Sequence, residues 1–465
     1  MEGIVSTIKI LGNSLKCNVL SVDEGKLTLS EAITKQQIKI GEKISLSSTL
    51  DVKFLGTANN KELNQIDKIL STLIQEYIKK TPPIFDLEDL NTATKKLFPK
   101  IMEAAKLFAK KLLLGAPIII RFHNDADGSS GAYAISLSIN SLISDFSIQS
   151  KPNITWLMQR SVVYEISDAI YDQNLFNYFS STEKPLLLIT DFGTSSQSNR
   201  GIERISESFD IIWLDHHPIE DDFNYKKLKH YINPWNFNLG SDITAGFLSC
   251  IFGYALSGKL NEEIINASFI GDYSKYADVK KLGNDLSIFL DMATSDPSAL
   301  GSHNPKNITP SEIEGIISDK EKYNSFLKVA KMKLDETLER AKSSIKTYKL
   351  KNLNIYVCDF SSIRDKNSKY PLPGRFSSKL LDVLSEKDKN SILILHFGVY
   401  ISMRMDKELS KDIDLLSIIS ELKDNIDDVE SGGGHASACS LKLYEYADKK
   451  AYINTIINKI KEKEK

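Results

Sequence analysis

The chain has 465 residues, of which 42% are hydrophobic and 26% charged, and these values exclude small disulfide-stapled peptides, disordered chains and fibrous repeats. Lysine plus arginine number 59 against 61 aspartate plus glutamate, so the net charge of −2 does not indicate a nucleic-acid partner, and any such site must be local. The sequence contains no apolar run long enough for a bilayer and no signal-peptide pattern, so we expect a cytoplasmic protein with no membrane partner.

The N-terminal part divides into two patterns. Residues 1–60 alternate apolar and polar side chains in short runs separated by turns, which predicts a small β module. Such a module can bind nucleic acid as a small barrel does, or it can serve for packing or protein docking. Residues 61–114 have a helical period that is interrupted at Pro82-Pro83, and they predict a helical segment.

The rest of the chain has an α/β pattern. Short apolar runs at 118–120, 186–189 and 211–214 end in polar residues, as buried parallel strands do. Helical patterns lie between them, so we predict a doubly wound parallel sheet within residues 115–310. A long charged helix is expected over 311–348 as a bridge to a smaller α/β domain over 349–465.

Carboxylates and imidazoles follow the predicted strands of the core. The first strand leads into His123, Asp125 and Asp127, the second into Asp191, the third into Asp215, His216 and His217, and a later helical run ends at Asp272. Because the carboxyl ends of neighbouring parallel strands face one crevice, we expect these groups to converge.

Several carboxylates in one crevice repel one another unless positive charge lies between them, and divalent metal ions supply that charge. The four cysteines are far apart in the sequence, which disfavours a thiolate cluster. Imidazole and carboxylate ligands without thiolates favour Mn²⁺, with Mg²⁺, Co²⁺ or Zn²⁺ as alternatives. We therefore expect two divalent metal ions, an arrangement that suits in-line attack on phosphorus.

The ordered motifs resemble the DHH phosphoesterase superfamily, and within it the RecJ-like single-strand exonucleases of archaeal type. Asn233-Pro234 and Thr244-Ala245-Gly246 resemble the stretch between the third and fourth motifs of this family. The resemblance implies one metal held by His123, Asp125 and Asp191, and a second held by Asp127, Asp191, His216 and Asp272. It also implies that Asp215 orients a histidine and that His217 contacts the scissile phosphate.

The C-terminal part resembles the DHHA1-type substrate-binding domain. Its glycine loop corresponds here to Gly432, Gly433, Gly434 and His435, which together with Arg404 would hold phosphates of the bound strand. The alternative is that the three glycines only form a tight turn into the final strand. Arg375 is a further candidate contact, with a surface or capping role as its alternative.

The resemblance implies a metal-dependent phosphodiesterase that acts as a single-strand-specific exonuclease on DNA, with RNA as a further substrate, in DNA repair or replication. One alternative is a small-molecule phosphodiesterase, for short oligonucleotides or a cyclic dinucleotide, or a pyrophosphatase. Another is an inactive Cdc45-like replisome scaffold, which the filled ligand positions disfavour. Docking of an active nuclease on a helicase or replisome protein is also compatible with the resemblance.

Overall fold

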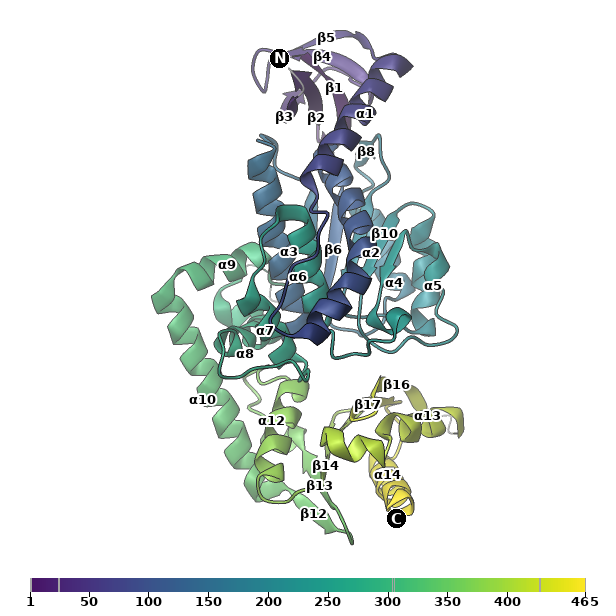
Figure 1. The fold of residues 1–465 in the computed structure, drawn as a ribbon, viewed down its shortest axis with the longest axis vertical. Coiled ribbons are helices and arrows are strands. Elements are labelled where there is room, and N and C mark those ends of the chain that lie inside the picture. Colours follow the sequence, from purple (N-terminus) through teal and green to yellow (C-terminus); the bar gives the residue numbers. More distant parts are fainter. Residues whose placement is uncertain (1, 24–25, 303, 305, 426–427, 465) are drawn as a thin grey trace. The chain divides into compact units, whose positions relative to one another are not determined.

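The computed structural model describes residues 2–23, 26–302, 304, 306–425 and 428–464, which form two compact units (Figure 1). The first unit spans Met1–Ser287 and Asn307–Gly315, and the second spans Ile288–Lys306 and Ile316–Lys465. Among the described residues, no helix combines the length and the apolar character that a bilayer span requires.

The N-terminal residues form an antiparallel sheet, because alternate side chains of its strands are apolar. Its strands are β1 (Glu2–Leu11), β2 (Ser14–Asp23), β3 (Lys26–Thr34), β4 (Glu42–Leu46) and β5 (Val52–Thr57), in the order β3-β2-β1-β4-β5. The short strand β8 (Phe179–Ser181) pairs with β1 from much later in the sequence. The Thr7 hydroxyl donates to the Gly115 carbonyl at 3.0 Å and so ties this sheet to the turn before the next one.

Two helices connect the antiparallel sheet to the core of the first unit. They are α1 (Asn60–Tyr77) and α2 (Glu88–Leu113), and Pro82-Pro83 lies between them. The ammonium of Lys111 on α2 is buried, 2.8 Å from Glu183 and 2.7 Å from Asp210. These ion pairs link α2 to Asp210, the first residue of β10, and to Glu183 in the segment before β9.

The core of the first unit is a five-stranded parallel sheet, which confirms the predicted α/β class. Its strands are β6 (Ile118–His123), β7 (Ile154–Gln159), β9 (Leu186–Thr190), β10 (Asp210–Leu214) and β11 (His230–Ile232), in the order β11-β10-β9-β6-β7. In the strand register, Phe122 of β6 pairs with Thr190 of β9, and Thr190 pairs with Leu214 of β10. The segments that follow β6, β9 and β10 therefore leave the sheet side by side at the same edge.

Helices cover both faces of the parallel sheet. On one face, α4 (Ile166–Leu175) and α5 (Asn199–Ser206) pack through Ala169, Ile202 and Ile205 against alternate strand residues such as Leu187 and Trp213. On the other, α3 (Ala126–Asp145) packs on β6 and β9, and α6 (Ala245–Ser257) and α7 (Glu262–Gly271) pack on α3. Trp213 and Phe247 are among the largest fully buried side chains.

The segment expected as one helix over 311–348 is divided. After α8 (Asn284–Ser295), the chain forms α9 (Pro310–Ser318), then α10 (Lys320–Ser344), and then the strand β12 (Lys346–Lys349). Asp319 separates the two helices, because its backbone is extended and its side chain accepts a hydrogen bond from the Lys322 amide at 3.1 Å. An aspartate in this position starts a new helix rather than continuing the old one.

The second unit contains a six-stranded mixed sheet in the order β12-β13-β14-β15-β17-β16. The further strands are β13 (Asn354–Asp359), β14 (Ser391–Phe397), β15 (Tyr400–Met405), β16 (Val429–His435) and β17 (Ala438–Leu443). On one face, α10, α11 (Phe360–Ile363) and α12 (Pro373–Ser385) pack against β13 and β14. On the other face lie α13 (Leu415–Asn425) and α14 (Lys449–Lys463).

Candidate metal centre

The structure brings the predicted strand-end residues together at one edge of the parallel sheet. His123 is the last residue of β6, and Asp191 and Asp215 directly follow β9 and β10. Asp125 caps α3, with its Oδ1 atom accepting a hydrogen bond from the Gly128 amide at 3.0 Å. The close approach of α3 to β6 requires glycine at 128, because a Cβ atom there would lie 2.6 Å from the His123 carbonyl oxygen.

Asp191 belongs to two groups of metal-ligating side chains. In the first group, His123 Nδ1 lies 2.7 Å from Asp125 Oδ2 and 3.8 Å from Asp191 Oδ2. In the second, Asp191, Asp215, His216 and His217 each offer a ligand atom within 4.8 Å of the others. The first group matches the first predicted ligand set, and Asp191 occupies the position shared by both groups.

The second group differs from the second predicted ligand set, which had Asp127 and Asp272 in place of Asp215 and His217. Asp127 nevertheless lies beside this group, with its Oδ2 atom 3.7 Å from His216 Nε2. Asp272 approaches the opposite side of the same ring, where its Oδ2 atom is 3.7 Å from Nδ1. Asp272 is among the more accessible of the predicted ligands, since its side chain is 32% exposed.

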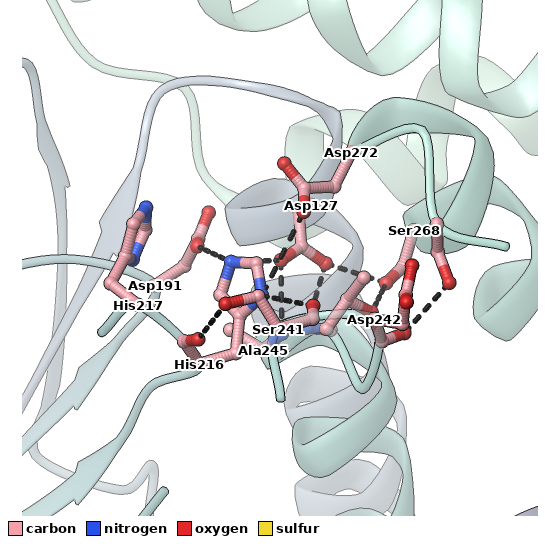
Figure 2. A network of polar contacts seen from close by, with 12 residues as sticks. Asp127, Asp191, His216, His217, Ser241, Asp242, Ala245, Ser268 and Asp272 are labelled. Atoms are coloured by element: carbon pink, nitrogen blue, oxygen red, sulfur yellow. Dashed lines mark hydrogen bonds and ion pairs between the residues drawn. The ribbon is translucent and has the colours of Figure 1, made fainter. Parts of the chain in front are cut away.

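The Asp127 carboxylate is held by the N-terminus of α6. It accepts hydrogen bonds from the amides of Ala245 at 2.9 Å and Gly246 at 2.8 Å, and from the Ser268 hydroxyl (Figure 2). Thr244 caps the N-terminus of α6 and so helps to position these two amides beside Asp127. A Cβ atom at 246 would lie 2.7 Å from Asp127 Oδ1, so the contact requires glycine.

The tautomer of His216 is set by a main-chain contact. His216 Nδ1 lies 2.8 Å from the Ser241 carbonyl oxygen, which can only accept a hydrogen bond, so Nδ1 carries the proton. Nε2 then faces the carboxylates, 3.4 Å from Asp191 Oδ1 (Figure 2). This is the arrangement in which an imidazole ligates a metal while its other nitrogen is anchored.

His217 is oriented by Asp215 rather than by the main chain. Asp215 Oδ1 lies 2.8 Å from His217 Nδ1 and also accepts a hydrogen bond from the His216 amide at 2.8 Å. Asn233 supports the same turn from behind, since its side-chain amide donates to the His217 carbonyl at 3.0 Å. The His217 side chain is 33% exposed, so it is the accessible member of the second group.

Two buried carboxylate oxygens in this cluster accept no hydrogen bond from the described residues. Asp191 Oδ2 and Asp215 Oδ2 have no hydrogen-bond partner within the part of the chain that the structure describes. A buried polar atom without a partner is costly, and a divalent cation bound by Asp191 would satisfy the Oδ2 atom of that residue. The oxygen and imidazole donors fit Mn²⁺ or Mg²⁺.

The raised pKa values of two carboxyl groups also indicate that the cluster needs additional positive charge. Burial, together with the charges of Asp125 and Asp127, raises the pKa of the Asp191 carboxyl well above its ordinary value. Burial and the charge of Asp272 outweigh the attraction of His216 and raise the pKa of Asp127 to about 6. Metal ions would remove this repulsion and keep both carboxylates ionised.

Charged neighbours outweigh burial in setting the pKa values of both His216 and Asp215. Burial lowers the pKa of His216, but the negative charges of Asp272, Asp127 and Asp191 prevail and raise it well above the ordinary value. Burial raises the pKa of Asp215, but the charge and hydrogen bond of His217 prevail and lower it. Asp215 therefore stays ionised and can hold the His217 ring.

The backbone of Asp191 has a left-handed conformation, with φ of 70°. Such a conformation is uncommon for a residue other than glycine and occurs often at functional sites. The Asp191 amide donates to the Leu214 carbonyl at 3.0 Å, which fixes the bend at the end of β9. The strained turn aims the carboxylate at both neighbouring motifs.

The supporting contacts of Ser241 and Ser268 were not predictable from residue types. Ser241 acts through its main-chain carbonyl and Ser268 through a common hydroxyl group, so neither stands out in the sequence. Thr244-Ala245-Gly246 did give a signal, because this segment resembles the stretch between the third and fourth motifs of the DHH phosphoesterases.

The predicted strand contacts lie in the second unit. Arg404 is on β15, and its Nε atom donates to the Ser377 hydroxyl at 2.8 Å. Gly432, Gly433 and Gly434 belong to β16, so they form an edge strand rather than a loop. The backbone of His435 ends this strand, but its side chain lies outside the described part of the structure.

The prediction of Arg375 as a strand contact requires correction. Its side chain is 6% exposed and forms an ion pair with Asp291, whose side chain is 5% exposed. The apolar residues around it on α12, including Phe376 and Leu380, belong to the core of the second unit. The Arg375 side chain is therefore buried and paired within the second unit, which favours a structural role over contact with a bound strand.

Comparisons with known proteins include one match in sequence and one match in structure that covers most of the chain. No protein-family model matches the chain. An uncharacterized protein of Methanocaldococcus jannaschii is 26% identical over 235 residues, which are 46% of this chain and only 30% of that protein's length. The solved structure of a DHH domain, from a member of a family of ribosomal proteins, superposes with a TM-score of 0.71 and 21% identity, covering 86% of this chain and 98% of that one.

A more remote match is RecJ of Thermus thermophilus in complex with Mn²⁺, with a TM-score of 0.47 and 12% identity, covering 85% of this chain and 58% of that chain. The superposition on the DHH domain confirms the fold that the motifs predict. This chain thus has the fold of that DHH domain, and the strand-end carboxylates and imidazoles form a cluster within it that can hold metal ions.

Proposed function

We propose that this protein is a metal-dependent phosphodiesterase that hydrolyses terminal phosphodiester bonds of single-stranded DNA, with RNA as a further substrate. The position of Asp191 carries the proposal. Its carboxylate is shared by two groups of ligands, and it has a buried oxygen without a partner among the described residues. A bridging carboxylate of this kind is typical of two-metal hydrolytic sites.

The cluster offers ligands for two metal ions. His123, Asp125 and Asp191 would hold the first, and Asp191 and His216 would hold the second with Asp127 and Asp272. We propose Mn²⁺ for both positions, with Mg²⁺ or Co²⁺ as alternatives. When bound, such ions lower the pKa of a water molecule and neutralise the phosphate.

The chain's own residues would then position the substrate. Asp215 fixes Nδ1 of His217, so Nε2 is the ring atom that would face an oxygen of the scissile phosphate. In the second unit, Arg404 and the backbone of Gly432, Gly433 and Gly434 would hold phosphates further along the strand. We assign the activity to DNA repair or replication in the cytoplasm, with docking on a helicase or replisome protein as part of the proposal.

The test is a parallel hydrolysis assay with the full chain. The protein is incubated with Mn²⁺ and end-labelled single-stranded DNA, blunt duplex DNA, RNA, dinucleotides and pyrophosphate. We expect mononucleotides from single-stranded DNA, and no product with excess EDTA or with Asp191→Asn. Turnover of dinucleotides or pyrophosphate alone would establish the small-molecule alternative. Tight Mn²⁺ binding without hydrolysis of any of these substrates would favour the scaffold.

A further inference from the structure

Several side chains of β15 and β17 in the second unit are accessible on the face of the sheet opposite to α13 and α14. On β15, Ile401 and Met403 are buried, whereas Tyr400 is 39% exposed and Arg404 is half-buried. The strand β17 alternates in the same way, with Leu441 buried and its neighbours Ser440 and Lys442 accessible. The buried side chains face α13 and α14. On the other face, α12 reaches β15 at Arg404, whose Nε atom donates to the Ser377 hydroxyl, whereas Tyr400 and Ser440 remain exposed.

The strand register places the accessible side chains in rows. Tyr400 is level with Lys442 and Ser431, Ser402 is level with Ser440 and Gly433, and Arg404 is level with Ala438. We call these eight residues the open face. Successive rows are separated by two residues, which is about 6.7 Å along a strand.

The chemistry of the open face is that of a nucleic-acid surface rather than an apolar docking surface. It contains a guanidinium, an ammonium, three serine hydroxyl groups and one aromatic ring. Gly433 lies on the edge strand, and a Cβ atom there would have no neighbour within 4 Å. Main-chain groups of an edge strand with so much space around them are accessible to phosphate.

The ring of Tyr400 is held in place by Phe397. The two ring centroids are 5.3 Å apart and the rings are inclined by 19°, which is a stacked arrangement. Phe397 covers one face of the Tyr400 ring, and the tyrosine remains 39% exposed. A ring fixed in this way can stack on a base with little loss of conformational freedom.

Positive charge on the open face is concentrated at the end opposite to Tyr400. The Lys442 ammonium lies 2.6 Å from Glu430, which partly neutralises it. Arg404 is therefore the main cation. Its Nε atom is held by the Ser377 hydroxyl of α12, and the residue is four positions from Tyr400, or about 13 Å along the strand. A phosphate at Arg404 and a base at Tyr400 would lie on one extended strand.

We infer that the open face binds a single strand beyond the phosphate contact of Arg404, with a base of the strand stacked on Tyr400. This inference rests on the proposed function, which requires a single-strand substrate but does not involve Tyr400. Tyr400 would be a binding residue and would have no part in the chemical step.

The test compares Tyr400→Ala and Tyr400→Phe with the unsubstituted protein. Binding of a fluorescein-labelled oligothymidylate is measured by anisotropy in EDTA, which prevents cleavage. Loss of one stacked base should weaken binding about tenfold, whereas phenylalanine retains the ring and should bind as the wild type does. The matched control is Tyr348→Ala on β12, a tyrosine that is 37% exposed at the opposite edge of the same sheet.

A strand without bases tests whether Tyr400 contacts a base of the bound strand. The wild type should bind it more weakly than oligothymidylate, and Tyr400→Ala should then cause no further loss. Ser440→Glu is a second variant, since this exposed position in the middle row can accept a larger side chain, and the added negative charge should weaken binding of both strands.

The outcomes separate this inference from the proposed function. If Tyr400→Ala and Ser440→Glu bind oligothymidylate as the wild type does, while the wild type still cleaves single strands with Mn²⁺, the open face is not the binding surface. If the wild type neither binds nor cleaves a single strand, the proposed function fails and this inference fails with it. An equal loss in Tyr348→Ala would also overturn the inference, because a tyrosine remote from the open face should not matter.

Discussion

The carboxylate of Asp215 and the ring of His217 form an oriented pair, with Oδ1 2.8 Å from Nδ1. Asp215 is fully buried at the end of β10, whereas His217 is 33% exposed, so a fixed anion controls an accessible imidazole. The same Oδ1 atom also accepts from the His216 amide. Asp215 is thus linked to the main chain of His216 and to the ring of His217.

This pair leads to a prediction for Asp215→Asn. The amide has the size of the carboxylate but no charge, so it should hold the His217 ring less firmly and in a less defined tautomer. We expect turnover of single-stranded DNA to fall about 10- to 100-fold with little change in Mn²⁺ affinity by calorimetry. Asp221→Asn, an exposed carboxylate on the following loop, is the control. A large loss of Mn²⁺ affinity would instead make Asp215 a metal ligand.

A second prediction concerns the bridging role of Asp191. Mn²⁺ at 100 times its dissociation constant should stabilise the folded protein by about 2.7 kcal/mol and raise its melting temperature, because the unfolded chain has no assembled site. Asp191→Asn should abolish this shift together with activity. Asparagine is the appropriate substitution, since it tolerates the left-handed backbone of residue 191, whereas alanine would add strain. An unchanged Mn²⁺-induced shift in the variant would exclude the shared ligand.

The third prediction tests the contact between α6 and Asp127. In Gly246→Ala the new Cβ atom would meet Asp127 Oδ1 at 2.7 Å and Ser268 Oγ at 2.6 Å, so the carboxylate must move. We expect weaker Mn²⁺ binding and at least tenfold lower activity, measured at saturating metal. Gly315→Ala is a matched control, because a Cβ atom there would have no neighbour within 4 Å, and alanine in a helix is favoured by up to about 1 kcal/mol. Equal effects of the two substitutions would refute the contact argument.

The sequence predicted the parts of the fold and site that depend on residue type and period. The strands β6, β9 and β10 were predicted because their residues are apolar on both faces, and the acids and imidazoles that follow were assigned to one edge because parallel strands end together.

The sequence did not predict contacts that depend on tertiary approach. The Ser241 carbonyl that holds His216 exists in every residue type, and the burial of Arg375 depends on its partner Asp291, which is far away in the sequence. The break at Asp319 was missed because apolar residues continue with a helical period on both sides of it. The three glycines were expected as a loop, but pairing with β17 makes them a strand.

The last prediction uses the contrast between two arginines of the second unit. Arg404→Ala should raise the KM for a long single strand about tenfold, which corresponds to about 1.4 kcal/mol for one charge-assisted phosphate contact. It should also reduce the salt dependence of binding, and it should leave hydrolysis of a small chromogenic phosphodiester unchanged. Arg375→Ala should behave oppositely. Because it leaves the Asp291 carboxylate buried without its partner, it should lower the free energy of unfolding by about 3 to 5 kcal/mol, measured by denaturant titration. The double variant Arg375→Met with Asp291→Leu should recover most of that stability, since no buried charge remains. If Arg404→Ala impairs the small diester as much as the long strand, Arg404 acts in the chemical step rather than in strand binding.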